Sequence, residues 1–139
     1  GEFGVRGVGY YVDSLREHLT KILGLDTEHR VCIVGAGRLG TALSEYNGFN
    51  GSNFRILALF DADPAKIGKK VGEVLIHDIK TFSETVKRDS IEFAVIAVPA
   101  PMAQEVYDLV IDSGIRAVLN FAPVALKSIA DVKLKTVDL

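Results

Sequence analysis

The sequence predicts an α/β fold in which a doubly wound, mostly parallel β-sheet follows a lead-in helix. From Arg30 onward, short apolar runs alternate with stretches of helical periodicity, which is typical of parallel strands joined by helical crossovers. A glycine-rich turn, Gly35-Ala36-Gly37-Arg38-Leu39-Gly40, follows the first apolar run directly, and Asp61 closes the second run. A strand, a glycine turn, a helix and an acid in this order favour a Rossmann-like sheet.

Residues 1–24 precede this alternation and are expected to form a glycine-rich linker and the lead-in helix. The glycines that predict a flexible or tightly turning start, across residues 1–9, are Gly1, Gly4, Gly7 and Gly9. Apolar residues then recur at helical spacing, which predicts a helix with one apolar face: Val12, Leu15, Leu19, Ile22 and Leu23. Asp13 is expected to cap the start of this helix, and Gly24 to follow its end.

Residues 25–139 are expected to form the sheet domain itself. The predicted strands are residues 31–34, 54–60, 74–76, 93–98, 117–119 and 134–137. The predicted helices lie within residues 39–46, 79–86 and 102–110. Because the strongest strands are apolar throughout, they are expected to be buried on both faces, as in a parallel sheet covered by helices.

Composition and charge limit the classes of protein to consider. A chain of 139 residues, with 48% hydrophobic and 24% charged residues, suits one soluble domain with a buried core. The formal net charge of −2 gives this chain no electrostatic reason to bind nucleic acid by itself. Cys32, as the one cysteine, excludes an internal disulfide and fits a cytoplasmic location. No apolar run approaches the ~20 residues of a membrane span, and no signal peptide is visible.

The glycine turn is the motif that carries chemistry. In a dinucleotide-binding turn the first glycine, Gly35, allows the tight turn, Gly37 leaves room for a pyrophosphate, and Gly40 lets the helix pack closely on the strand. The pyrophosphate would lie at the helix N-terminus, where free N–H groups and the helix dipole favour an anion. The alternative is a turn that only packs a strand on a helix.

Asp61 is expected to bind the adenosine ribose and to select the cofactor. It lies 21 positions after Gly40, about the distance expected for a carboxylate on the ribose hydroxyls. Its charge would repel a 2′-phosphate, so NAD(H) is expected rather than NADP(H), although Lys66, Lys69 and Lys70 weaken this argument. The alternative role for Asp61 is a capping acid before Pro64.

The ends of the later strands are expected to complete the crevice on the nicotinamide side. The residues concerned are Val98, Pro99, Ala100, Asn120, Phe121 and Ala122. They include no acid, so the neutral reduced ring should bind more tightly than the cationic oxidised ring. Ordinary loop packing is the alternative explanation.

Other chemistry is missing from the sequence. No cluster has metal-ligand spacing, no tyrosine is followed four residues later by lysine, and no acid–base pair is evident near the expected nicotinamide position. His18 and His29 fall outside the expected crevice, and His77 is expected at the surface. The sequence therefore predicts a binding domain without catalytic or metal-ligating residues.

Several runs together resemble the Rex family of bacterial redox-sensing repressors, over nearly all 139 residues. Those runs are residues 2–10 (Glu-Phe-Gly-Val-Arg-Gly-Val-Gly-Tyr), the glycine turn with Val34, Phe60-Asp61, Ala97-Val98-Pro99-Ala100, Asn120-Phe121-Ala122-Pro123 and Val137-Asp138-Leu139. The opening run and the Asn-Phe-Ala-Pro run are more specific to the family than the glycine turn.

The resemblance implies a dimeric repressor that senses the NADH/NAD⁺ ratio, in which NADH lowers the affinity for operator DNA and NAD⁺ permits binding. It implies an N-terminal winged-helix DNA-binding domain and a C-terminal helix exchanged between subunits. Neither is found in this chain, which is therefore expected to be a fragment of a longer protein. The resemblance carries the dinucleotide loop onto Gly35 to Gly40, the ribose acid onto Asp61, and a contact with the exchanged helix onto Tyr46, whose alternative is helix-end packing.

Two other functions remain open at this point. The chain could be the cofactor-binding half of an NAD-dependent dehydrogenase, or a CoA-binding domain, because a similar glycine turn can receive the phosphates of CoA. Asp61 suits a free ribose diol and would repel the 3′-phosphate of CoA. The lack of an acid–base pair disfavours the enzyme.

Overall fold

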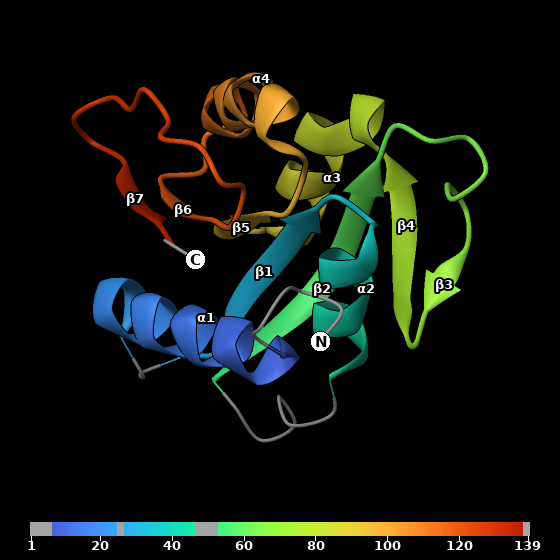
Figure 1. The fold of residues 1–139 in the computed structure, drawn as a ribbon, viewed down its shortest axis with the longest axis horizontal. Helices are drawn as coiled ribbons and strands as arrows, with labels where there is room; N and C mark the ends of the chain where they lie inside the picture. Colours follow the sequence, from blue (N-terminus) through green and yellow to red (C-terminus); the bar gives the residue numbers. More distant parts are fainter. Residues whose placement is uncertain (1–6, 25–26, 47–52, 138–139) are drawn as a thin grey trace.

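A seven-stranded sheet forms the centre of the computed structural model, which describes residues 7–24, 27–46 and 53–137 (Figure 1). The strands are β1 (His29–Val34), β2 (Phe54–Asp61), β3 (Lys70–Val71), β4 (Val74–Asp78), β5 (Phe93–Ile96), β6 (Ala117–Asn120) and β7 (Lys133–Thr136). The helices are α1 (Val8–Leu23), α2 (Arg38–Glu45), α3 (Phe82–Asp89) and α4 (Ala100–Asp112), with a 3₁₀ turn, η2 (Ile79–Thr81), before α3.

The strand order is β3-β4-β2-β1-β5-β6-β7, and every neighbouring pair except β3–β4 is parallel. The chain leaves β1 in one direction through β2 and β4, returns beside β1 as β5, and continues the other way through β6 and β7. With the short β3 set aside, this is the strand order of a doubly wound dinucleotide-binding fold. The predicted fold class, including the helix before the first strand, is confirmed.

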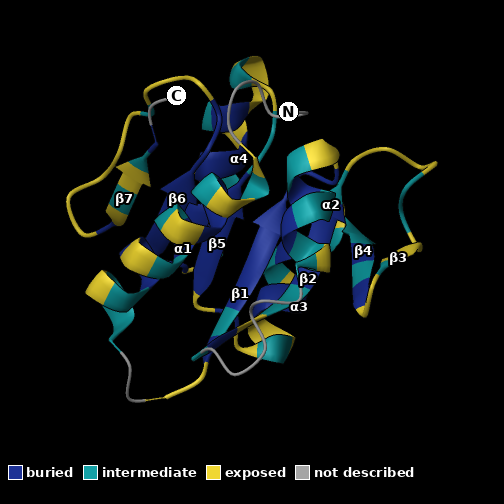
Figure 2. Ribbon diagram, turned by 60° about the horizontal axis from the view of Figure 1, so that its bottom comes forward, coloured by how far each residue is buried: buried dark blue, intermediate teal, exposed yellow. Residues whose placement is uncertain are grey.

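Helices cover both faces of the sheet, as its apolar strands require. One core packs α1 and Leu43 of α2 against one face, and a second core packs α3 and α4 against the other. Figure 2 shows the buried strands between these two layers, with α1 and α2 on the nearer side. A parallel sheet needs this double cover because apolar side chains alternate to both of its faces.

The lead-in helix begins earlier than the sequence predicted. α1 starts at Val8 with Gly7 at the N-cap position, so the expected cap at Asp13 is wrong, and Gly9 lies within the helix. The reason is tertiary packing, since Tyr11, in the first turns of α1, is 2% exposed and joins the sheet core. Gly24 ends the helix as expected, with φ +76° and its N–H donating to the carbonyl of Thr20. Of the glycine-rich start expected over residues 1–9, residues 1–6 lie outside the described residues.

α1 shares one hydrophobic core with the sheet. Leu15 and Leu19 are fully buried and belong to the same cluster as Val31 and Ile33 of β1. The boundary placed at residue 24 therefore does not separate two cores. It remains a division drawn from the sequence.

Other element boundaries differ by a few residues from the prediction. β5 ends at Ile96 instead of residue 98, and α4 begins at Ala100, because the backbone has left the ladder before Pro99. The two-residue β3 was not expected and pairs antiparallel with β4 across a turn with positive φ at Gly72. No helix within the described ranges is long and apolar enough to cross a bilayer.

His18 on α1 makes the stability of the fold depend on pH. Its ring packs edge-on to Phe93, the residue is 8% exposed, and its Nε2 has no partner among the described residues. Burial lowers the pKa of His18, as do Lys135 on β7 and Lys21, against the backbone hydrogen bond at Val118 and the charge of Glu17.

In the unfolded chain His18 takes up a proton near pH 6.5, and in the folded chain it does so only at lower pH. The free energy of unfolding should therefore fall as the pH drops from 6.5 to 5, by at most about 1.4 kcal/mol per pH unit for this residue. His18→Phe should reduce that slope in urea titrations. The same titrations on His77→Gln measure the contribution of His77 to the slope, because burial and Arg88 lower the pKa of His77 as well. An unchanged slope in His18→Phe would contradict the assignment.

Candidate functional site

The candidate site lies where the two halves of the sheet diverge. β1 and β5 are neighbours whose connections leave in opposite directions, which opens a crevice beyond their carboxyl ends. The arrowheads of β1, β2 and β4 end at this same edge of the sheet (Figure 1). The glycine turn leaves β1 here and enters α2 at Arg38. The backbone N–H of Gly35 donates to the carbonyl of Phe60 at 2.8 Å, so the turn is hydrogen-bonded to β2.

The three glycines of the turn occupy three different environments. Gly35 has φ +113°, and a Cβ atom there would lie 2.3 Å from the carbonyl oxygen of Ala97. Gly40 is enclosed by the turn itself, since a Cβ would lie 1.8 Å from the Gly35 oxygen. At Gly37 no atom of the described residues, apart from the adjoining chain, lies within 4 Å of an added Cβ. The turn therefore packs tightly on both sides and is open at Gly37, where the sequence predicted space for a ligand.

Asp61 is held beside this turn. Its Oδ2 accepts a hydrogen bond from the backbone N–H of Ala36 at 2.8 Å, and its Oδ1 accepts one from the N–H of Asp63 at 2.9 Å. Asp61 thus stabilises the turn that leads to Pro64, where no helix directly follows in the described part of the chain for it to cap. It also lies next to the glycine turn, 25 positions from Ala36 in the chain. Because each carboxylate oxygen has more than one lone pair, these bonds leave Asp61 able to accept from a ribose hydroxyl.

A cleft of about 670 Å³ opens beside Asp61 and the glycine turn. Five of the predicted site residues line it: Gly35, Gly37, Asp61, Val98 and Pro99. Its apolar wall was not predicted as part of the site and includes Ile79, Met102, Val106 and Leu109. Its charged lining, besides Asp61, consists of Asp63, Lys66, Lys80 and Glu105. An apolar slot with a few charged groups at its rim has the chemistry of a nucleotide-binding cleft.

The apolar wall had a signal in the sequence that was interpreted differently. Met102, Val106 and Leu109 recur at helical spacing, and that spacing predicted only a helix within residues 102–110. In the structure Met102 is 43% exposed, because α4 turns part of this stripe toward the cleft. Sequence periodicity identifies the stripe but does not show that a crevice interrupts its contact with the sheet.

The other predicted site residues lie outside the cleft lining. Ala36, Arg38, Leu39 and Gly40 belong to the turn and the first turn of α2, and Ala100 begins α4. Ala36 and Gly40 are buried, whereas Arg38 is exposed. Their contact with a cofactor remains a prediction, and the backbone N–H groups at the start of α2 are the part of this set best placed to meet an anion.

The loop after β6 is tightly packed. Asn120 is fully buried, and its amide donates to the carbonyls of Ala122 and Val124 and accepts from the N–H of Ala122. Phe121 is 3% exposed and packs edge-on against Tyr11 of α1 at 5.0 Å between ring centroids. The Asn120 side chain therefore shapes the loop, and a cofactor contact from residues 120–122 stays a prediction.

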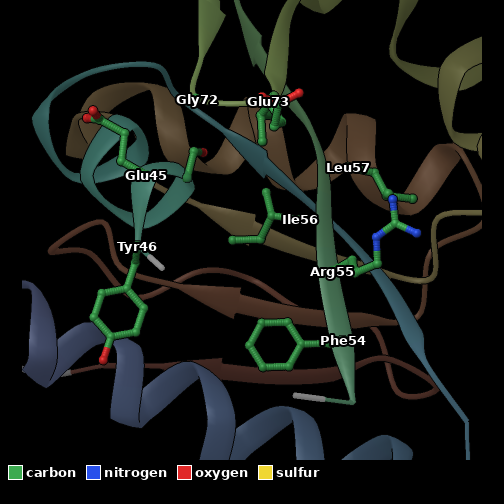
Figure 3. A pocket seen from close by; sticks show the side chains of 10 residues that line it. Glu45, Tyr46, Phe54, Arg55, Ile56, Leu57, Gly72 and Glu73 are labelled. Atoms are coloured by element: carbon green, nitrogen blue, oxygen red, sulfur yellow. The ribbon is translucent and has the colours of Figure 1, made fainter. Parts of the chain in front are cut away.

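A second hollow, of about 540 Å³, lies away from the glycine turn, between α2, β2 and the β3–β4 turn (Figure 3). Ile56, Tyr46 and Glu73 are among its lining residues. Tyr46 follows α2, is half-buried, and has the Arg16 guanidinium 5.9 Å from its ring centre. This contact with α1 is the helix-end packing considered from the sequence; a contact with an exchanged helix remains a prediction.

The remaining candidates from the sequence have structural surroundings. The Nδ1 atom of His29 lies 2.6 Å from Glu92, and its Nε2 lies 3.2 Å from the carbonyl of Gly24. His77 packs against Phe60 and does not line the cleft. Cys32 is fully buried in β1, and burial raises the pKa of its thiol. Within the described ranges, no three His, Cys, Asp or Glu side chains are grouped to hold a metal ion.

The strand order, the glycine turn and the adjacent acid define the class of the protein as a Rossmann-type nucleotide-binding domain. Residues 26–124 match the family model described as "CoA binding domain". The redox-sensing transcriptional repressor Rex of Desulfitobacterium hafniense is 47% identical over 139 residues, which are all of this chain and 66% of that protein. Rex of Brevibacillus brevis is 45% identical over 138 residues, 99% of this chain and 67% of that protein. This chain belongs to the Rex family.

Solved structures agree with this assignment. RSP, a Rex-family repressor, matches with a TM-score of 0.79 and 38% identity over 98% of this chain and 64% of that chain. RSP in complex with β-NADH matches with a TM-score of 0.78 and 36% identity over 93% of this chain and 64% of that chain. UDP-D-quinovosamine 4-dehydrogenase from Vibrio fischeri, with a TM-score of 0.57 and 21% identity over 68% of this chain and 79% of that chain, shares the fold alone. The chain spans about two thirds, or slightly less, of the Rex relatives.

Proposed function

We propose that this chain is the NADH/NAD⁺-sensing domain of a redox-responsive transcriptional repressor. The observation that carries the proposal is Asp61, held against the glycine turn by its 2.8 Å hydrogen bond from Ala36 at the edge of an apolar cleft. Asp61 would accept from the adenosine ribose hydroxyls, and the open position at Gly37 would admit the pyrophosphate. Related RSP structures contain β-NADH in one case and β-NAD⁺ with operator DNA in another, which supports the same ligands here.

In the intact protein the cofactor would regulate DNA binding. NADH would lower the operator affinity of a homodimer, and NAD⁺ would permit binding, through a DNA-binding domain that this sequence does not include. The proposed location is the cytoplasm. Operator binding by the intact protein, measured by fluorescence anisotropy at constant salt, should weaken on addition of NADH and not on addition of ADP-ribose, which lacks the nicotinamide.

A CoA-binding domain is the second candidate, because residues 26–124 match a family model of that description. Asp61 argues against it, since the 3′-phosphate of CoA would approach a carboxylate. Calorimetric titration with NADH and with CoA separates the two: the proposed function requires NADH to bind and CoA to bind far more weakly. A dehydrogenase half remains the enzyme alternative, and steady protein-dependent oxidation of NADH by small ketones or aldehydes would favour it. We expect no such turnover.

Discrimination between the two redox states is expected at the nicotinamide. The adenosine, riboses and pyrophosphate are common to NADH and NAD⁺, so contacts from Gly37 and Asp61 cannot distinguish them. Val98 and Pro99 line the cleft beyond β5 and carry no charge, and moving the cationic oxidised ring beside them is costly. NADH should therefore bind at least about tenfold more tightly than NAD⁺, which requires only about 1.4 kcal/mol.

Titration of both cofactors and of ADP-ribose measures this preference. Ala100→Asp should shift the ratio toward NAD⁺ by placing a carboxylate at the start of α4, and Ala100→Asn provides a neutral control of the same size. Equal affinities for NADH and NAD⁺ in this chain and in the intact protein would contradict the apolar-pocket mechanism.

A further inference from the structure

Two lysines line the same cleft as Asp61. Lys66 comes from the loop after β2, and Lys80 from the 3₁₀ turn after β4. Neither ammonium group forms a salt bridge within residues 7–24, 27–46 and 53–137, where the ion pairs involve other residues. Both therefore present positive charge to the cleft without a paired carboxylate.

Asp61, which ends β2, and Asp63, which follows it, are hydrogen-bonded to the backbone instead. Asp61 accepts from the N–H groups of Ala36 and Asp63, and the Oδ1 of Asp63 accepts from the N–H of Ala65 at 2.9 Å. The backbone carbonyl of Asp63 also accepts a hydrogen bond from the N–H of Lys66 at 3.0 Å, so Lys66 belongs to the turn that begins at Asp63. The loop geometry that holds the acids thus also places Lys66 beside the cleft.

We propose that Lys66, assisted by Lys80, forms a latent subsite for a phosphate on the adenosine ribose, and that Asp61 closes this subsite to the 2′-phosphate of NADPH. This inference rests on the proposed function and assigns the choice of cofactor to the balance between one carboxylate and the lysines. With Asp61 ionised, the 2′-phosphate would meet a like charge at the position where the ribose hydroxyls of NADH find an acceptor. With that charge removed, the unpaired lysines would attract the phosphate.

The test uses the Asp61→Asn variant, which removes the charge and keeps one side-chain oxygen as an acceptor for the turn. NADPH should bind to Asp61→Asn at least about tenfold more tightly than to the unmodified chain, whereas NADH should bind more weakly. Adding Lys66→Gln to this variant should remove most of the gain. The NADPH affinity of Asp61→Asn should also fall more steeply with NaCl concentration than its NADH affinity, because the added interaction is between charges.

Lys69→Gln is the matched control. Lys69 lies in the same loop, carries the same charge and is exposed, but it does not line the cleft. In the Asp61→Asn background it should leave the NADPH-to-NADH affinity ratio within about twofold. In the otherwise unmodified chain, Lys66→Gln should lower that ratio several-fold more than Lys69→Gln does. This arm tests the subsite even if Asp61→Asn fails to fold.

The outcomes separate this inference from the proposed function. If NADH does not bind to the unmodified chain, the proposed function fails. If NADH binds but Asp61→Asn gains no NADPH affinity, or if Lys69→Gln removes as much as Lys66→Gln, the proposed function stands and the latent phosphate subsite is wrong.

Discussion

Replacement of Gly40 by alanine is expected to lower the free energy of unfolding by more than about 3 kcal/mol, or to prevent folding. The added Cβ would lie 1.8 Å from the carbonyl oxygen of Gly35 and 3.5 Å from Cγ2 of Ile33. The clash is with backbone in a turn that cannot move aside, because Gly35 is itself pressed against Ala97 and its N–H is bonded to Phe60. Urea denaturation followed by circular dichroism measures the loss.

Gly9→Ala is the matched control for this effect. Gly9 also lies in a helix, α1, but outside the helix's own backbone no atom of residues 7–24, 27–46 and 53–137 is within 4 Å of the Cβ that alanine would add. Alanine has the higher helix propensity, so Gly9→Ala should raise stability by about 0.5–1 kcal/mol. A Gly40→Ala variant as stable as the unmodified chain would show that α2 does not pack on the turn as the structure has it.

Replacement of Gly37 by valine is expected to produce the opposite pattern: a folded chain with at least about 100-fold weaker NADH binding, or a loss of about 2.7 kcal/mol. Among the described residues no atom beyond the neighbouring chain lies within 4 Å of a Cβ added at Gly37, so folding should continue. That space is at the lining of the cleft, where the pyrophosphate is proposed to approach the backbone. Gly37→Ala should show an intermediate loss in the same calorimetric titration.

Gly7→Val controls for the change at a helix start. Gly7 is the N-cap of α1 as Gly37 is the N-cap of α2, with φ −82° and −84°. Within the described part of the chain, and apart from the adjoining residues, neither has an atom within 4 Å of an added Cβ. Both variants should lose a similar, small amount of helix stability, but only Gly37→Val should bind NADH more weakly. If Gly37→Val binds NADH normally, the pyrophosphate does not lie at the turn and the proposed cofactor position is wrong.

The glycine turn and Asp61 could be predicted from the sequence because their requirements are local. The turn packs a helix against a strand at two of its positions and is open to a ligand at the third, and each of these positions favours glycine. Gly35, Gly37 and Gly40 occur at that spacing directly after an apolar run. The acid likewise follows from the length of one strand–helix–strand unit. The alternation of apolar runs and helical stripes was sufficient to predict that the sheet is mostly parallel.

The start of α1 could not be predicted in this way. Asp13 is a better N-cap residue than Gly7 by local preference, yet the helix begins at Val8 because Tyr11 and Val12 are buried against the sheet. Packing over a whole helix face outweighs a preference for Asp over Gly at the N-cap of roughly a few tenths of a kcal/mol. Local patterns similarly gave no indication of the two-residue β3, which exists because it can pair with the edge of β4.

By itself, the sequence determined the fold class, the place of the glycine turn and the acid that ends β2. Only the tertiary structure decided which other residues reach the cleft. Met102 and Glu105 of α4 line it, as do Lys66 and Lys80. The side chain of Asn120 is instead hydrogen-bonded to the backbone of its own loop. The physical reason is the difference between short-range and long-range constraints. Backbone conformation and apolar periodicity are written into neighbouring residues, whereas the walls of a crevice come from segments far apart in the chain that meet only when the sheet and helices have packed.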